Sequence, residues 1–270
     1  MALSILNNIP SLAAQNQMSI TSSSLQTTLF RLSSGSRINS GADDAAGLAI
    51  ADGLRANVSA LTQSSRNATD GIGLAQVADG ALAQVTNLLN RAVTLATESS
   101  TQTVSDTQRT ALDDELTAIK DEIDRIGTDT TFNGTAIFGN GAVSVFLSDG
   151  TQSNSIDVDP GDLSAADVGV AGTLDSDTNA KTALTQITDA IATVAAQRGT
   201  LGAAINRLQS ASAVIGNQIQ NLSAAEDGIR SADIAKEVAN MTKYTILNQT
   251  GMAALAQSNQ MQQSVLKLLQ

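Results

Sequence analysis

The sequence predicts a mainly α-helical protein, a long antiparallel coiled-coil helical bundle formed by N- and C-terminal segments, with a small β-hairpin region. Residues 184–222 carry large aliphatic side chains at ten of twelve positions spaced alternately three and four residues apart, as in a coiled coil. A helix of that length runs roughly 60 Å and needs a partner of matching length. Aromatic residues make up only 2% of the 270 residues, too few for a thick globular core. Thin helical rods suit this composition better.

The N-terminal segment, residues 3–33, is predicted to form a helix, with Pro10 close to its start. Its apolar residues at coiled-coil spacing are separated by Asn, Gln, Ser and Thr, so the isolated helix is weak. We expect it to order only when a partner covers these residues. They are Met18, Leu25, Leu29 and Leu32.

A loop at residues 33–41 precedes a second long helix, with Asp43 and Asp44 placed to cap its N-terminus. This helix is nearly as long as the 184–222 helix, so we expect the two helices to pair. Its predicted seam is Leu54, Val58, Leu61, Ser65, Ala68, Ile72, Ala75, Ala78, Leu82, Val85, Leu89, Ala92 and Ala96. The opposing seam includes Ile187, Ile191, Val194, Leu201, Ile205 and Leu208.

A shorter helix is predicted over residues 106–126, with its charged residues on a solvated outer face. The character of the chain changes at residues 127–180, where alternating strands flank the turn signal Asp149-Gly150. This region holds eight Asp and no Lys or Arg. Carboxylates there resemble a weak Ca²⁺ site, but the spacing differs from that of an EF-hand, and an exposed acidic surface is favoured. The three carboxylates are Asp157, Asp159 and Asp162.

A break near Asp227-Gly228 is predicted to start the last helix, whose seam has a polar middle. That seam is Ile234, Val238, Met241, Thr245, Asn248, Met252, Leu255, Asn259, Gln262, Leu266 and Leu269. The element order predicts that the chain folds back on itself, so that the long helices pair and the terminal helices pair beyond them. We expect residues 1–43 with 230–270 to form one coiled-coil domain, and residues 44–229 to form a second helical domain that includes the β-hairpin region.

Composition excludes several function classes. The chain has no Cys and no His, so it has no disulfide, no Cys/His metal site and no histidine-dependent catalysis. A net charge of −11 argues against nucleic acid as a partner. No apolar run is long enough to span a membrane, and the N-terminus lacks the charged region of a secretory signal peptide. We therefore expect no cofactor, and either a cytoplasmic protein or export by a route that reads no cleavable signal.

Several motifs resemble those of bacterial flagellins, and they occur in the same order at both ends of the chain. They are Ser33-Ser34-Gly35 with Arg37-Ile38-Asn39-Ser40, Asp43-Asp44-Ala45-Ala46-Gly47, Ser65-Arg66-Asn67-Ala68, Asp70-Gly71-Ile72, Glu122-Ile123-Asp124-Arg125-Ile126, Phe132-Asn133-Gly134, Arg198-Gly199, Asn206-Arg207-Leu208, Ala232-Asp233-Ile234 and Ser264-Val265-Leu266-Lys267-Leu268-Leu269. The resemblance covers nearly the whole chain and identifies a short flagellin with almost no variable outer domain.

The resemblance implies an inner coiled-coil layer from both termini, an outer layer of three helices with a hairpin, and a homopolymeric filament for swimming motility. It implies unfolded export through the flagellar secretion channel to an extracellular flagellum. The implied partners are the filament cap, the hook-filament junction proteins, an export chaperone and the export apparatus. It also implies a surface for the animal innate-immune receptor, in which Thr94 replaces an acidic residue. That surface comprises Asn90, Arg91, Thr94, Leu95 and Glu115.

The residues favour one of three functions. A filament subunit would use the terminal helices as an assembly seam, namely Met18, Leu25, Leu29, Leu32, Met252, Leu255, Leu266 and Leu269. An enzyme is disfavoured because metalloprotease chemistry needs histidine and the adjacent Asp113 and Asp114 diverge around a helix. The alternative is a hook-filament junction protein or another flagellar-type coiled-coil assembly protein.

Overall fold

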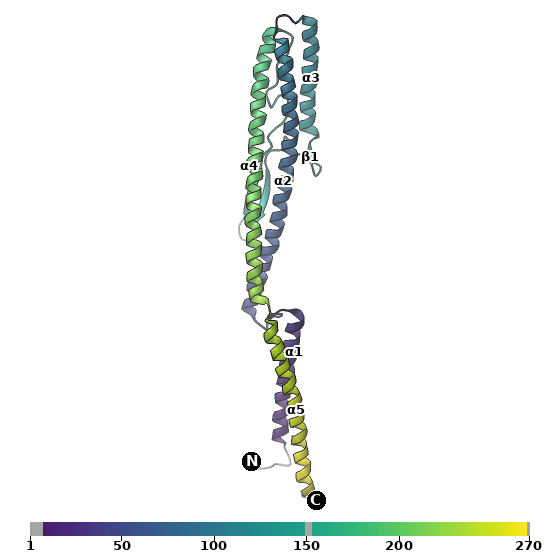
Figure 1. Ribbon diagram of the computed structural model, residues 1–270, viewed down its shortest axis with the longest axis vertical. Coiled ribbons are helices and arrows are strands. Elements are labelled where there is room, and N and C mark those ends of the chain that lie inside the picture. The colour runs from purple at the N-terminus through teal and green to yellow at the C-terminus, as the bar shows by residue number, and fades with distance from the viewer. Residues whose placement is uncertain (1–7, 149–152, 269–270) are drawn as a thin grey trace. The chain divides into compact units, whose positions relative to one another are not determined.

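The computed structural model describes residues 8–148 and 153–268. Five long helices and two small antiparallel hairpins follow one another along the chain (Figure 1). They are α1 (Ile9–Ser34), α2 (Ala45–Ser99), α3 (Asp106–Asp129), β1 (Thr131–Phe132), β2 (Thr135–Ala136), β3 (Val143–Ser148), β4 (Ser153–Val158), α4 (Asp177–Arg230) and α5 (Ile234–Leu268). The mainly α-helical fold predicted from the sequence is confirmed.

The chain divides into two compact units. Unit 1 comprises Met1–Arg55 with Leu222–Gln270, and unit 2 comprises Ala56–Asn221. In unit 1, α1 and α5 lie side by side, and in unit 2 so do α2, α3 and α4 (Figure 1). Unit 1 therefore combines two segments that are far apart in the sequence, whereas unit 2 is one continuous segment.

The core of unit 2 follows the predicted aliphatic seams. On α2 the fully buried positions include Leu82, Val85 and Leu89, and on α4 they include Leu201 and Leu208. The helices are antiparallel, because Asp79 on α2 pairs with Arg198 on α4 while Gly71 on α2 lies beside Leu208. The coiled-coil spacing therefore predicted the pairing, and the fold-back of the chain sets its direction.

At two places in the α2 seam, the residue before the predicted one is buried instead. Ser64 and Gly71 are buried, whereas the predicted Ser65 and Ile72 are half-buried. The reason is the β3–β4 hairpin, which packs on this face of α2. Ser64 Oγ donates to the Ser148 carbonyl at 2.8 Å and accepts its N–H at 2.9 Å. A Cβ on Gly71 would lie 2.5 Å from a methyl of Val145, so only glycine admits that side chain.

Local sequence signals set the ends of the helices. Asn8 Oδ1 accepts the Ser11 N–H at the start of α1, and Gly35 ends α1 in the left-handed region at φ 69. Asp44 Oδ1 caps α2 by accepting the Gly47 N–H, as expected from its position. Asn133 and Gly134, at φ 50 and φ 77, form the tight turn between β1 and β2.

The predicted break near Asp227-Gly228 is wrong by a few residues. Helix α4 continues through Arg230, and the chain turns at Ser231, which forms an isolated β-bridge with Ser36. Asp233 then caps α5, its Oδ1 accepting the Lys236 N–H. The glycine did not end the helix because the bridge and the Asp233 cap decide where the chain turns.

The outer face of α3, which the sequence predicts to be solvated, is solvated only in part. Three of its charged side chains bind main-chain atoms of residues 163–174, a segment we call the strap. Asp113 accepts the Leu174 N–H at 2.6 Å, Asp124 accepts the Ala165 N–H at 2.7 Å, and Lys120 donates to the Gly172 carbonyl at 2.6 Å. The strap buries its own apolar residues beneath these bonds. These apolar residues are Leu163, Ala165, Val168, Val170 and Leu174.

Candidate assembly interface

The interface between α1 and α5 is antiparallel and has a polar centre. Asn8 bonds Ser258 near the start of α1, Gly251 lies beside Met18, and Arg31 reaches Glu237 near the end of α1. Among the side chains that the structure describes, the buried ones on this interface are all polar. They are Thr21 and Thr28 on α1, and Glu237 and Ser258 on α5. Such a seam buries little apolar area, so it stabilises the pair only weakly.

The register of α5 differs from the predicted one. Apart from the half-buried Asn240, its described buried and half-buried positions follow an alternating spacing of four and three residues. These positions are Glu237, Met241, Tyr244, Asn248, Gly251, Leu255 and Ser258. Met241, Asn248 and Leu255 were predicted, whereas Ile234, Val238 and Met252 are exposed. Gly251 falls on this contact face, where a Cβ would lie at ordinary contact distance, 4.0 Å, from the Cβ of Met18.

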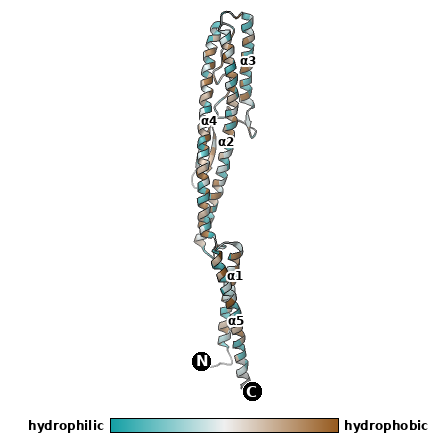
Figure 2. Cartoon of the chain, viewed as in Figure 1, coloured by the Kyte–Doolittle hydropathy of each residue, from teal (hydrophilic) through white to brown (hydrophobic). Residues whose placement is uncertain are grey.

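Helix α1 has a second, apolar face. Ile9, Leu12, Ile20 and Phe30 are 67%, 68%, 55% and 61% exposed. At 100° per residue they lie on the side of α1 opposite the α5 contact, and we call them the outer stripe. Figure 2, coloured by hydropathy, shows hydrophobic and hydrophilic residues interspersed along both terminal helices. A helix that buries threonines and exposes isoleucine, leucine and phenylalanine indicates a surface that another chain covers.

The predicted assembly residues of unit 1 whose side chains the structure describes fall into two groups. Met18, Leu25, Leu32 and Leu255 are half-buried between α1 and α5. Leu29 and Met252 are exposed, at 46% and 52%. Leu266 lies in α5 but its side chain is not described, and Leu269 lies outside the described residues. The predicted set thus spans the intrachain interface and the exposed surface beside it.

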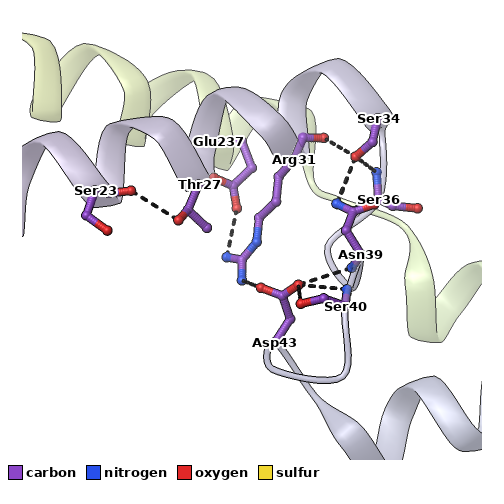
Figure 3. Close-up of polar contacts among 9 residues, drawn as sticks. All are labelled: Ser23, Thr27, Arg31, Ser34, Ser36, Asn39, Ser40, Asp43 and Glu237. Carbon is purple, nitrogen blue, oxygen red and sulfur yellow. Dashed lines mark hydrogen bonds and ion pairs between the residues drawn. The ribbon is translucent and has the colours of Figure 1, made fainter.

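A network of polar groups orders the loop after α1 (Figure 3). Arg31 lies between two carboxylates, with Asp43 at 3.3 Å and the buried Glu237 of α5 at 3.8 Å. The same Asp43 carboxylate accepts the Asn39 N–H and both the N–H and hydroxyl of Ser40. Arg31 therefore links the loop to α5 across the end of α1.

These bonds also lower the pKa of the Asp43 carboxyl. The Ser40 hydroxyl contributes most, followed by the main-chain N–H groups of Asn39 and Ser40, with a smaller part from Arg31. Each donor stabilises the ionised carboxylate. The loop thus holds Asp43 as an anion. Sequence reasoning had assigned Asp43 to the cap of α2, a role that Asp44 fills alone.

The predicted outer-layer residues contribute to the helix packing. Most are fully buried, and the rest are half-buried. The buried ones are Leu61, Ile187, Val194, Leu201 and Leu208, and the half-buried ones are Leu54, Val58, Ile191 and Ile205. Leu54 belongs to unit 1 and the others belong to unit 2. Within one chain these residues act as core.

The surface implied for the immune receptor lies on α2 and α3. Arg91 Nε donates to Glu115 at 2.7 Å, and this bond lowers the pKa of the Glu115 carboxyl. Asn90 and Thr94 are exposed, and the Thr94 hydroxyl donates to the Asn90 carbonyl. Leu95 is buried, at 1% exposure. The structure therefore brings four of the five residues to the surface together.

Within the described residues, no group of three acidic residues is placed to hold a metal ion. Asp157 instead bonds the Ser144 hydroxyl, and Asp159 accepts the Gly161 N–H within its turn. None of the described helices is long and apolar enough to cross a membrane.

The fold and the exposed apolar face define a class of protein: a long helical subunit built to assemble. Known families agree with this class. The bacterial flagellin N-terminal helical region matches residues 5–142, and the bacterial flagellin C-terminal helical region matches residues 184–269. A flagellin of Halalkalibacterium halodurans is 40% identical over 269 residues, covering 98% of this chain and 99% of that protein. A flagellin of Bacillus subtilis strain 168 is 36% identical, with the same coverage.

More distant relatives lead to the same family. A flagellar filament 33 kDa core protein of Treponema phagedenis is 34% identical, covering 98% of this chain and 99% of that protein. The crystal structure of Bacillus cereus flagellin superposes with a TM-score of 0.51 at 29% identity, over 60% of this chain and 94% of that one. The chain belongs to the bacterial flagellin family.

Family membership confirms the central predictions. The chain is a structural subunit of a flagellar filament, it associates with itself, and its family is not one of enzymes. It is also a short form without a large variable domain, because only the strap and its flanking turns lie between β4 and α4.

Proposed function

We propose that this subunit assembles by covering the outer stripe of α1 and the exposed apolar residues of α5 with the terminal helices of neighbouring copies. The observation that carries this proposal is the inverted distribution of side chains on α1. Its intrachain face buries Thr21 and Thr28, while its opposite face exposes Ile20 and Phe30. Burying each large aliphatic or aromatic side chain contributes about 1.5–3 kcal/mol.

This distribution couples the order of the terminal helices to polymerisation. The polar α1–α5 seam alone offsets little of the entropy that ordering these helices costs. Neighbouring copies supply the missing apolar contacts, so the helices order as the filament grows. Leu29 and Met252, exposed in the single chain, belong to the surface that the neighbours cover.

The experiment is filament growth on short seeds, followed by electron microscopy. Ile20→Asp is expected to abolish elongation while the unfolding transition of unit 2 stays unchanged. Gln26→Asp is the matched control, because it places the same charge on an exposed polar position of α1 and should still elongate. Filaments from the Ile20→Asp variant at the wild-type yield would refute this assembly surface.

The route to the filament is also proposed. A chain with no Cys and with a weakly paired terminal region suits unfolded passage through the flagellar secretion channel, without a cleavable signal peptide, to the cell exterior. There it would meet the filament cap and the hook-filament junction proteins, after an export chaperone and the export apparatus. Accumulation of the protein inside cells that lack a flagellar export apparatus, and its presence outside cells that have one, would test this route.

We propose in addition that the innate-immune receptor surface comprises Asn90, Arg91, Thr94 and Glu115, with the buried Leu95 beneath them. The Arg91–Glu115 ion pair fixes the two charged groups relative to each other. Replacing Arg91 by Ala should weaken binding of the receptor ectodomain to the monomer if this surface is used. Equal binding by both proteins would contradict it.

A further inference from the structure

A cavity of about 380 Å³ lies in unit 1, where the end of α1, the loop after it and the start of α5 meet. Its volume falls within the range of about 300–1,000 Å³ that is typical of small-molecule sites. Both segments of unit 1 contribute to its lining, so the cavity forms only when the two segments are paired. The charged side chains that line it are Arg31, Arg37, Asp233, Lys236 and Glu237.

The two carboxylates of the cavity are engaged by the chain itself. Asp233 Oδ1 accepts the Lys236 N–H and so caps α5. Glu237, whose side chain is 10% exposed, lies 3.8 Å from Arg31 (Figure 3). In the described part of the chain no third acidic residue joins them in a group that could hold a metal ion. A hard cation needs several free oxygen ligands, so it does not fit this cavity.

The cationic side chains of the cavity have unused hydrogen-bond donors. Arg31 Nε is buried and has no hydrogen-bond partner among the residues that the structure describes. Lys236 is exposed, and its ammonium group bonds no atom of residues 8–148 and 153–268. Arg37 donates from Nη2 to the Ile229 carbonyl at 2.9 Å, and no described carboxylate pairs with it. A buried donor without an acceptor costs free energy, which an incoming acceptor would recover.

We propose that this cavity binds a small oxyanion of the phosphate type. Its oxygens accept hydrogen bonds from Arg31 Nε, from the Arg37 guanidinium and from the Lys236 ammonium group. Such charge-assisted bonds to phosphate oxygens are stronger than bonds between neutral groups. The cavity also lies at the start of α5, where the helix dipole favours negative charge.

An anion in this cavity would connect α1, the loop after it and α5. Because it binds the paired arrangement of these segments and not the separated helices, it stabilises the α1–α5 pair as its concentration rises. This stabilisation adds to that of the polar seam, which is weak on its own. The site lies within one chain, so it does not depend on how the outer stripe is covered.

Equilibrium dialysis with radiolabelled inorganic phosphate tests the site on the full chain, both as monomers and as assembled filaments. Sodium chloride keeps the ionic strength constant, which separates binding in a cavity from the general screening of charges. One phosphate per chain should bind saturably to at least one of the two forms. Saturable binding to neither form would overturn the proposed site.

Substitutions of two lysines on α5 locate the bound phosphate. Lys236→Gln should weaken binding about tenfold or more, because it removes a charge-assisted bond, whereas Lys236→Arg should retain most of the affinity. Lys243→Gln is the matched control, since it removes the same charge from an exposed position of α5 outside the cavity. An unchanged affinity of the Lys236→Gln variant, or equal losses in the Lys236→Gln and Lys243→Gln variants, would show that phosphate does not occupy this cavity.

Discussion

Gly127 in α3 lies against the carbonyl oxygen of Leu163 so closely that a Cβ would be 1.9 Å from that oxygen. The obstacle is main chain at the start of the strap, so it cannot turn away as a flexible side chain would. This contact lets the strap lie flat on α3, where Asp113, Lys120 and Asp124 bind it.

Gly127→Ala should therefore destabilise unit 2 by about 2 kcal/mol or more, despite the higher helix propensity of alanine. Gly199→Ala is the matched control in α4, where a Cβ would meet open space. It should stabilise the chain by up to about 1 kcal/mol. Urea unfolding of the monomers measures both, and equal effects of the two substitutions would show that the close contact does not form.

The side chain of Asp124 should hold the strap through its bond to the Ala165 N–H. Asp124→Ala is expected to cost about 1 kcal/mol and to speed hydrogen exchange in residues 163–174. Asp121→Ala, three residues away on the exposed surface of α3, should change neither quantity measurably. If hydrogen exchange in residues 163–174 is unchanged in the Asp124→Ala variant, Asp124 does not hold the strap.

Ser64 should matter more than its neighbour Ser65, because its buried hydroxyl makes two bonds to the main chain of Ser148. Ser64→Ala should cost about 1–3 kcal/mol and loosen the β3–β4 hairpin. Ser65→Ala removes a half-buried hydroxyl on the same turn of α2 and should cost much less. Thermal unfolding of both variants measures the two losses of stability. Equal losses would show that the hairpin does not dock on α2 through Ser64.

Because the seam between α1 and α5 is polar, an apolar substitution in it is expected to stabilise the pair of helices. Thr21→Val keeps the shape of a buried side chain whose hydroxyl bonds only within α1, to the Gln17 carbonyl at 2.8 Å. The monomer should become more helical by far-UV circular dichroism, with a gain of about 0.5–1 kcal/mol in the α1–α5 pairing. Elongation of seeds should persist because the outer stripe is unchanged. A loss of helicity would show that the threonine hydroxyl is needed.

Asp43 predicts an acid sensitivity of the loop after α1. Its pKa is lowered in the folded state, so its contribution to stability is fully present above the ordinary carboxyl pKa of about 3.9 and is lost as the pH falls through the lowered value. Asp43→Asn should remove this part of the acid dependence. An NMR titration of the Asp43 carboxyl measures the pKa directly, and a value at or above the ordinary one would contradict the network.

Much of the fold was predictable because coiled-coil spacing acts locally. Spacing alone predicts a buried stripe on each long helix, and the structure buries Leu201 and Leu208 on α4 and Leu82 and Leu89 on α2. The positions missed were those where a third element intervenes. Ser64 and Gly71 are buried because the hairpin packs on them, and no spacing rule favours a serine and a glycine over Ser65 and Ile72.

In the terminal helices, too, some features follow from the sequence and others only from the tertiary structure. The sequence by itself determined that they are weak amphipathic helices, that they lack the chemistry of an enzyme, and that their motifs resemble those of flagellins. Only the tertiary structure decided which face of each helix points inward. The physical reason is that the small Thr21 and Thr28 of α1 are buried in its contact with α5, while the larger Ile20 and Phe30 stay outside, where only another chain can bury them.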